Sequence, residues 1–460
     1  MSWKTRSFRL LAAMTLAAAP TLAATAQEPA VEAASGATEA KAKAEAKLSE
    51  EQVRLNLESF DAVWETIRDK HFDPDLNGVD WPAVREELRP KVAEAGSMDE
   101  ARGAMQEMIK RLNQSHFGII PSSVYDAIDG DEDTDRGDGQ AGLHVRAVDG
   151  EALVVLVEPG SPAEEIGIKP GWVVEAVEGK PVGPVLEKVV EAFEDSTQYD
   201  LYASRAVERR LGGPVGSERT ATFRDGDGNS VEKTITLAKP RGTTARFGNL
   251  PPMQVYFESR VIDDEIPYVH WSAFFDPAGL IPKIGEAITG HLDAPGLVLD
   301  LRGNPGGIGA MAMGICGWLF GEAGQRLGTM STRDTDLNFV VFPRPRTFDG
   351  PVAVLVDGCS ASTSEIFAGG LQDLGRARIF GTRTAGAALP SVVVKLPNGD
   401  GFQYAFANYI SADGEALEGS GVEPDQPAPP ARDALLQGGD PALDAAVEWI
   451  RSQAAGRSGG

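Results

Sequence analysis

The spacing of apolar residues along the chain changes, and each spacing predicts a different kind of structure. Between residues 48 and 125, apolar side chains recur every three or four positions, which predicts a small domain of amphipathic helices. From about 240 to 430, short and uniformly apolar runs alternate with helical patterns, which predicts a mostly parallel sheet covered by helices. Residues 431–460 contain one more helical pattern, at 441–450, and a short tail. We therefore expect a multidomain protein with an α/β core.

In the predicted core, one apolar run leads into a cluster of small hydroxyl residues. Residues 352–356 predict a buried strand, residues 358–364 predict a turn, and the apolar residues that follow recur at helical spacing. This order exposes a serine hydroxyl at the end of a sheet, and the first N–H groups of the helix point at the same place. The same residues would equally serve as a Ser/Thr-rich helix cap. Taken alone, the segment leaves both interpretations open.

A second segment, residues 297–307, predicts another buried strand followed by a turn with three glycines. Because glycine has no Cβ, such a turn allows the backbone to approach a ligand closely. Together the two segments, LDLRGNPGG and SASTSEIFAGGLQDLGRARIFG, resemble those of the C-terminal-processing (tail-specific) serine proteases and of the core of tricorn protease. The resemblance implies that Ser362 is the nucleophile. It also implies an oxyanion hole formed by the N–H groups of Gly306, or Gly307, and of Thr363.

The general base expected in one branch of this family is missing. Proteases of the lysine type carry their lysine just after a Gly-x-x-Thr-x-Gly turn, which occurs here at residues 381–386. The lysine position is Ala387, and no lysine occurs between Lys283 and Lys395. Arg383 does not replace it, because a guanidinium stays protonated in proteins. Since a serine hydroxyl needs an adjacent base, either another residue supplies it or the protein is inactive.

The chain has five histidines from which a base can come. The tricorn-like branch has a Ser-His pair just after its helical domain and a glutamate late in its core. By that resemblance His116 is the base, Ser115 the linking hydroxyl and Glu418 the polarising carboxylate. Glu423 is the alternative for the carboxylate. His270, in a predicted core strand, is the second candidate for the base.

Residues 139–238 resemble a PDZ domain, a fold that binds the C-termini of polypeptides by strand addition. The resemblance rests on the segments AGLHV, EPGSPA and IGIKPG. It implies that Gly142, Leu143 and His144 form the turn that holds a terminal carboxylate. The alternative is a PDZ-like domain that acts only as a structural lid.

Composition and charge exclude several other functions. The formal net charge of -25 argues against nucleic acid or an anionic membrane as a partner. The two cysteines, Cys316 and Cys359, do not make a disulfide framework, and no His/Cys cluster has zinc spacing. The acidic stretch 126–138 lacks the glycine that a calcium-binding EF-hand loop requires at its sixth position. We therefore expect neither a metal nor a cofactor.

The N-terminus has the pattern of a secretory signal. Residues 1–26 combine basic residues, an apolar stretch too short to span a bilayer and a small-residue cleavage site. Residues 27–47 are rich in Ala, Glu and Lys, which predicts a solvated linker. We therefore expect an exported protein, most plausibly periplasmic, without stable membrane insertion after signal cleavage.

The leading interpretation is an exported serine endopeptidase that cleaves polypeptides and selects them by their C-termini. Its nucleophile would be Ser362, activated by His116. The alternative, from another functional class, is a catalytically inactive peptide-binding protein on a protease scaffold. The intact serine motif and glycine turn favour the first interpretation, and the missing lysine favours the second.

Overall fold

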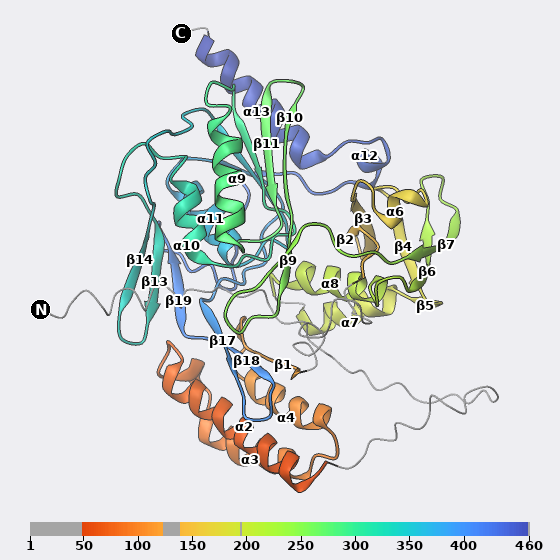
Figure 1. Ribbon diagram of the computed structural model, residues 1–460, viewed down its shortest axis with the longest axis vertical. Coiled ribbons are helices and arrows are strands. Elements are labelled where there is room, and N and C mark those ends of the chain that lie inside the picture. The colour runs from red at the N-terminus through yellow and green to blue at the C-terminus, as the bar shows by residue number, and fades with distance from the viewer. Residues whose placement is uncertain (1–47, 123–138, 194–195, 459–460) are drawn as a thin grey trace, which may run out of the picture.

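The computed structural model describes residues 48–122, 139–193 and 196–458. They form a helical domain (48–122) at one end, a middle domain (139–238) at the side and a large α/β core that carries the C-terminal helix (Figure 1). The α/β fold class expected from the sequence is confirmed. The expected signal peptide (1–26), the linker (27–47) and the acidic stretch (126–138) lie outside the described residues.

Three helices and one short 3-10 turn make up the helical domain: α2 (Glu50–Lys70), η1 (Leu76–Gly78), α3 (Trp81–Glu94) and α4 (Met98–Lys110). Each α-helix starts where a Ser or Asp side chain accepts a hydrogen bond from the first turn. Phe60, Val63 and Ile67 recur along α2 and are fully buried against α3 and α4. The predicted apolar periodicity therefore corresponds to the interior of this domain.

A small antiparallel sheet joins the helical domain to the rest of the chain. Its strands, in the order β1-β18-β17, are β1 (Gly118–Ile120), β18 (Gly401–Ala405) and β17 (Ser391–Lys395). Phe402 packs among the apolar side chains of the helices, and Arg102 of α4 forms an ion pair with Asp400 at 2.8 Å. The apolar run at 392–394 thus lies outside the large parallel sheet, although its composition resembles that of a core strand.

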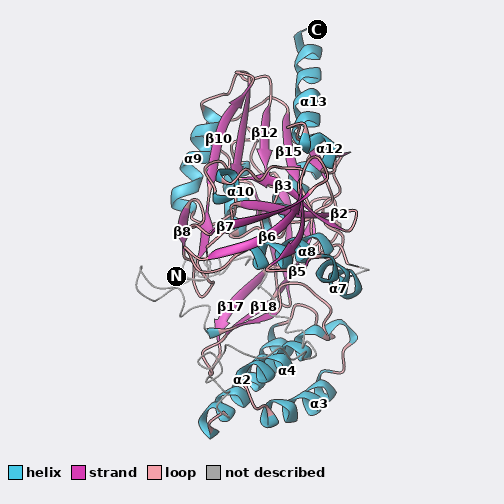
Figure 2. Ribbon diagram, turned by 90° about the vertical axis from the view of Figure 1, so that its right-hand side faces the viewer, coloured by secondary structure: helices cyan, strands magenta, loops and turns pink. Residues whose placement is uncertain are grey.

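The middle domain is a five-stranded antiparallel sheet with helices on it (Figure 2). Its strands are β2 (Leu143–Val148), β3 (Glu151–Val157), β4 (Val173–Val177), β6 (Glu218–Arg224) and β7 (Ser230–Thr236), with the short β5 (Lys180–Pro181) beside β4. Its helices are α6 (Pro162–Glu165), α7 (Gly183–Phe193) and α8 (Tyr199–Leu211). The predicted hairpin between residues 221 and 237 is formed by β6 and β7. β2 is an edge strand of this sheet, and α8 packs beside it.

The core contains a six-stranded sheet in the order β10-β11-β12-β15-β16-β20. The strands are β10 (Phe257–Ile262), β11 (Ile266–Trp271), β12 (Leu297–Asp300), β15 (Val352–Val356), β16 (Arg378–Gly381) and β20 (Gln426–Pro427). All neighbouring pairs are parallel except β10 with β11. The parallel sheet predicted from the sequence is thus present, with one antiparallel edge strand.

Helices cover both faces of this sheet, which explains why its strands are uniformly apolar. Val354 packs toward α9 (Pro277–Thr289), α10 (Gly309–Cys316) and α11 (Thr363–Asp373). Its neighbours Ala353 and Leu355 pack instead toward α13 (Pro441–Ser458). Because β12 and β15 are adjacent and parallel, the loops that follow them emerge at the same edge of the sheet.

The remaining elements complete the surface of the core. β14 (Asp336–Val340), β13 (Arg326–Thr332) and β19 (Ala407–Ser411) form a three-stranded sheet, and β8 (Thr243–Ala245) pairs with β9 (Met253–Val255). A short helix, α12 (Arg432–Leu436), precedes α13 and packs its Leu435 on the middle domain.

Replacing Arg102 by methionine should destabilise the contact between the helical domain and β18. The Asp400 side chain, which is 0% exposed, would lose its cation. We expect the free energy of unfolding to fall by about 3–5 kcal/mol, the usual cost of removing one partner of a buried ion pair. Urea-induced unfolding followed by circular dichroism measures the change.

Arg54→Met is the matched control, because it removes ion pairs with Glu51 and Glu58 that are exposed. It should leave the free energy of unfolding nearly unchanged, because exposed ion pairs contribute little to stability. Equal losses in the two variants would contradict the role given to the Arg102–Asp400 pair.

Candidate active site

Ser362 lies between β15 and α11 in a backbone conformation that few residues other than glycine adopt. Its φ is 60° and its ψ is -118°. Its side chain is 0% exposed, and no residue of the described chain hydrogen-bonds its Oγ. A strained residue with an unsatisfied buried hydroxyl costs stability. Such a cost is typical of functional sites, and the strand–serine–helix geometry predicted from the sequence is present.

Glu365, which sequence analysis missed, fixes this conformation. One carboxylate oxygen accepts the N–H of Ser362 at 2.8 Å and that of Ala387 at 3.0 Å. The other accepts from the Thr384 hydroxyl and the Gly386 N–H, both at 2.7 Å. Burial raises the pKa of the Glu365 carboxyl to about 7, although the four donors favour its charged form. The Ser-x-x-Glu spacing of a capping box, from Ser362 to Glu365, is the signal in the sequence from which this contact could have been found.

The glycine turn after β12 lies directly against the nucleophile loop. A Cβ on Gly306, whose φ is +95°, would lie 2.7 Å from both the Cβ of Ser362 and the N of Thr363. Only glycine therefore fits at this position. The main-chain oxygen of Asn304 accepts from the N–H of Ala361 at 3.0 Å and from the Ser364 hydroxyl at 2.9 Å. The two loops that the sequence singled out are thus bound to each other.

The three amides expected in the oxyanion hole differ in availability. The N–H of Gly306 donates to Oδ1 of Asn304 at 2.9 Å and is therefore occupied. For the N–H groups of Gly307 and Thr363, no acceptor is present within the described ranges. The Thr363 hydroxyl donates to the Gly307 oxygen at 2.8 Å, which places these two residues side by side. Among the three expected amides, those of Gly307 and Thr363 thus have no acceptor among the described residues.

Ser115, His116 and Glu418 are brought together as the resemblance implied. The Ser115 hydroxyl lies 2.6 Å from Nδ1 of His116 and donates to Oε2 of Glu418 at 2.8 Å. Oε1 of Glu418 accepts the N–H of Ser115, also at 2.8 Å. Burial raises the pKa of the Glu418 carboxyl, while the donors Ser115 and Ala388 oppose that rise. His116 itself is only 4% exposed.

The two alternative candidates, Glu423 for the carboxylate and His270 for the base, make other contacts. The Glu423 side chain is 60% exposed and forms an ion pair with Arg383. His270 lies on β11, where its Nδ1 is 3.0 Å from the main-chain oxygen of Asp300. Neither residue joins the contacts of Ser115 and His116.

Adjacent amides connect the histidine group to the serine loop. The N–H of Ala387 donates to Glu365, which also holds Ser362, and the N–H of Ala388 donates to Glu418 at 2.9 Å. Ala387, the position of the lysine in the lysine-type branch, is 1% exposed in an apolar cluster with Leu201 and Ala361. This position therefore contributes a backbone amide and no base.

The beginning of α8 covers the nucleophile loop. The Thr197 hydroxyl donates to the main-chain oxygen of Ala385 at 2.8 Å, and Leu201 packs on Cys359 and Ala361. A Cβ on Gly358 would lie 2.4 Å from the Cβ of Asp200. The start of α8 and the residues before it thus pack against the residues that flank Ser362, which is itself fully buried.

The expected peptide-binding residues lie at the start of β2. Gly142, with a φ of +72°, precedes the strand, and its oxygen accepts the N–H of Glu158 at 2.9 Å. Nε2 of His144 lies 3.0 Å from Glu158, and Nδ1 lies 3.7 Å from Glu208. Partial burial disfavours the charged imidazole, but the two carboxylates prevail and raise the pKa of His144 to about 9. His144 thus belongs to an ion-pair cluster on the middle domain.

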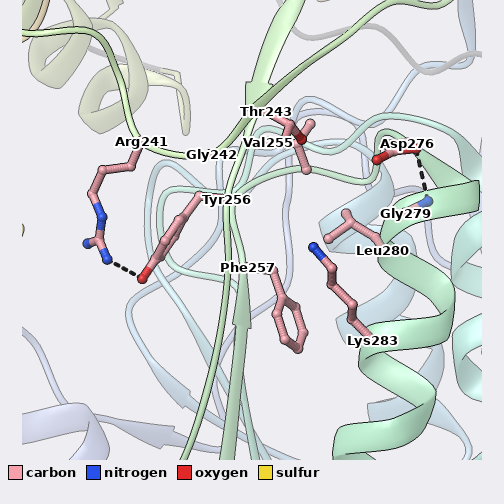
Figure 3. A pocket seen from close by; sticks show the side chains of 10 residues that line it. All are labelled: Arg241, Gly242, Thr243, Val255, Tyr256, Phe257, Asp276, Gly279, Leu280 and Lys283. Atoms are coloured by element: carbon pink, nitrogen blue, oxygen red, sulfur yellow. Dashed lines mark hydrogen bonds between the residues drawn. The ribbon is translucent and has the colours of Figure 1, made fainter.

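A surface cavity of about 360 Å³ lies between β9, β10 and the start of α9 (Figure 3). Arg241 hydrogen-bonds the hydroxyl of Tyr256 on one side, and Asp276 caps the N–H of Gly279 on the other. None of the residues predicted for the site lines this cavity.

The part of the chain that the structure describes lacks both a metal-binding cluster and a membrane-spanning helix. It contains no group of three His, Cys, Asp or Glu side chains that could hold a metal ion. It also contains no helix long and apolar enough to cross a membrane.

Comparison with known proteins finds two domains of known families in this chain. Residues 265–428 match Peptidase family S41, and residues 56–110 match the Tricorn protease C1 domain. Carboxyl-terminal-processing peptidase 3 of Arabidopsis thaliana chloroplasts is 26% identical, covering 79% of this chain and 67% of its own. The carboxyl-terminal-processing protease of Synechocystis sp. is 25% identical, covering 82% of this chain and 81% of its own.

Solved structures show the same fold. The photosystem II D1 C-terminal processing protease matches with a TM-score of 0.56 at 23% identity, covering 86% of this chain and 99% of that one. Mature CPAF matches with a TM-score of 0.59 at 15% identity, covering 89% and 99% of the two chains. The matched family region contains both the glycine turn and the serine loop described above. The chain therefore carries a peptidase S41 domain, which supports a serine-type peptidase similar to the carboxyl-terminal-processing proteases.

Proposed function

We propose that this peptidase is an exported endopeptidase in which Ser362 is the nucleophile and His116 the general base. The observation that carries the proposal is the continuous set of contacts from Glu418 through Ser115 to His116. The neighbouring amides of Ala387 and Ala388 join this set to the loop of Ser362. Export is inferred from the signal-like pattern of residues 1–26.

The direction of the hydrogen bonds supports the role of His116. Because the Ser115 hydroxyl donates to Glu418, its oxygen remains to accept the Nδ1–H of His116. In that tautomer Nε2 carries the lone pair, and in the proposed reaction it takes the proton of Ser362. In this structure the Ser362 hydroxyl has no hydrogen-bond partner among the described residues, so the bond to His116 forms on the way to the reactive complex.

The reaction follows the acyl-transfer sequence. Ser362 Oγ attacks the peptide carbonyl carbon while its proton passes to His116. The resulting oxyanion is stabilised by the N–H groups of Gly307 and Thr363. His116 then returns the proton to the leaving amine as the carbon–nitrogen bond breaks. Water, deprotonated by His116, hydrolyses the acyl-enzyme and restores Ser362.

We infer that the middle domain selects substrates by their C-termini. The turn before β2 contains Gly142, and β2 is an edge strand, as strand addition requires. A purely peptide-binding role on an inactive scaffold is not favoured, because the family relationship supports a peptidase.

Ser362→Ala should reduce peptide turnover by at least about 10⁴-fold and abolish labelling by a fluorophosphonate probe, because the other hydroxyls of the turn, those of Ser360, Thr363 and Ser364, donate to main-chain oxygens. Ser360→Ala is the matched control. The hydroxyl of Ser360 donates to the main-chain oxygen of Leu301 at 2.7 Å and so has a structural partner. We expect Ser360→Ala to lower stability while remaining labelled. If Ser360→Ala were the unlabelled variant, the register of the nucleophile would be wrong.

His116→Ala should lose activity almost as completely as Ser362→Ala, because members of one catalytic unit are not additive. Ser115→Ala and Glu418→Gln should lose less, about 10- to 10³-fold, since they orient the base. In the wild type, kcat/KM should rise with pH through the range of an imidazole, near about 6.5. Peptide-cleavage assays that measure kcat/KM between pH 5 and 9 give this profile. Wild-type rates in His116→Ala would transfer the role of base to His270.

Peptides that end in an apolar residue with a free carboxylate should be cleaved faster than the same peptides amidated. Amidation removes the charge that the turn at Gly142 would hold. The comparison of kcat/KM for matched pairs of peptides measures the effect. Equal values would remove the recognition role from the middle domain.

A further inference from the structure

His71, which the proposed reaction does not use, is a buried histidine directly after α2. It is 0% exposed, and its Nδ1 lies 2.9 Å from the main-chain oxygen and 3.0 Å from the main-chain nitrogen of Asp73. Its Nε2 lies 2.7 Å from Oε1 of Gln114, which is an acceptor, so Nε2 carries a hydrogen. The bonds on its two nitrogens set the orientation of an imidazole ring. The ring of His71 is therefore fixed from two sides.

His71 contacts the segment of His116 on both flanks. Gln114, its hydrogen-bond partner, directly precedes the pair formed by Ser115 and His116, and Phe117 directly follows that pair. The ring of Phe117 stacks on that of His71, with centroids 5.6 Å apart and planes 17° from parallel. A hydrogen bond before the pair and a ring contact after it thus hold the segment against His71.

The backbone of this segment needs such support. His116 has a φ of 60° and Asn113 a φ of 49°, values that residues other than glycine seldom adopt. Such conformations persist only where the surrounding structure holds them. On one side, Glu418 accepts both the main-chain N–H and the hydroxyl of Ser115. On the other side, the bond to Gln114 and the stack on Phe117 come from His71.

The main chain of His71 is in turn fixed to the core by Arg333. Nε of Arg333 donates to the main-chain oxygen of His71 at 3.0 Å. Its Nη1 and Nη2 donate to the main-chain oxygens of Asp69 at 3.3 Å and of Arg68 at 3.1 Å. Arg333 lies in the turn between β13 and β14, a hairpin that points toward the helical domain in Figure 1. Because one rigid guanidinium holds three carbonyls at the end of α2, the place of His71 is set relative to the core.

We propose that His71 is a positioning residue that, through Gln114 and Phe117, sets the direction of the His116 ring. This inference rests on the proposed function, in which His116 takes the proton of Ser362. A general base acts only within hydrogen-bond reach of the proton that it removes. A shift of about 1 Å in the segment is therefore enough to slow the reaction by about 10²-fold. His71 acts through its neighbours and transfers no proton itself.

Gln114→Leu removes the acceptor of the His71 Nε2–H and nearly keeps the size of the side chain. We expect kcat to fall by about 10- to 100-fold with KM within about twofold, because the base is misplaced and the substrate contacts are not. The rate at which a fluorophosphonate labels Ser362 should fall in parallel. Gln114→Glu keeps an acceptor oxygen and should restore kcat to within about threefold of wild type. Equal losses in the two Gln114 variants would contradict the proposal.

A double-mutant cycle tests whether His71 and Gln114 act together. His71→Phe keeps a ring that can stack on Phe117 and removes both ring nitrogens, so kcat should again fall by about 10- to 100-fold. The double variant His71→Phe/Gln114→Leu should lose no more than the larger single loss, because both changes break the same hydrogen bond. Losses that multiply would reveal two independent effects and would refute the link.

Leu88→Ala is the matched control for loss of stability in the helical domain. Leu88 lies on α3, is 0% exposed and packs in the interior of that domain. Its truncation leaves a cavity and lowers stability, but it removes none of the bonds between His71 and Gln114. Assayed well below its melting temperature, this variant should keep the wild-type kcat and labelling rate. A loss as large as that of Gln114→Leu would assign the effect to instability and overturn the proposal.

The same set of variants separates this inference from the proposed function. If the wild type is neither labelled nor active, or if His116→Ala keeps the wild-type rate, the proposed function itself fails. If the wild type is active and His116→Ala is not, while His71→Phe and Gln114→Leu keep the wild-type kcat, only the positioning role of His71 fails.

Discussion

The carboxylate of Glu365 collects hydrogen bonds from four donors that belong to two separate loops. A buried carboxylate is stable only when it is solvated by such donors, so the loop of Ser362 and the turn at 384–387 are held in one arrangement. The turn at 384–387 also places the next amide, that of Ala388, where it donates to Glu418. Glu418 contacts Ser115, and Ser115 contacts His116, the proposed base. The arrangement of nucleophile and base therefore depends on one side chain that makes no contact with substrate in the proposed reaction.

The fold was largely predictable because each part of it has its own hydrophobic pattern. Strands such as β12 and β15 are buried on both faces, so their sequences are uniformly apolar, and the helices of the first domain bury one stripe each. The sheet to which β17 belongs was not predictable. Its residues 392–394 have the composition of a core strand. They lie against the helical domain because β17 pairs with β18.

Sequence comparison supplied candidate residues for the site and not the connections between them. Family resemblance indicated Ser362, His116 and Glu418, but residue spacing gives no distance between segments so far apart in the chain. Glu365 was missed, and even its capping-box spacing would predict only the local bond to Ser362, not the bonds to the turn at 384–387. Gly306 was expected to donate to the oxyanion, and its N–H is instead used by Asn304, a tertiary contact that depends on how the turn closes.

The contact between Ser115 and Glu418 spans 303 positions of the sequence. During synthesis, the segment with the histidine leaves the ribosome early, the serine follows, and the carboxylate that orients the base comes near the end. A nascent chain or a fragment cut before residue 418 holds both of the side chains proposed to react but lacks the carboxylate that contacts Ser115. In the proposed mechanism, the base is therefore oriented only after nearly the whole core has been synthesised.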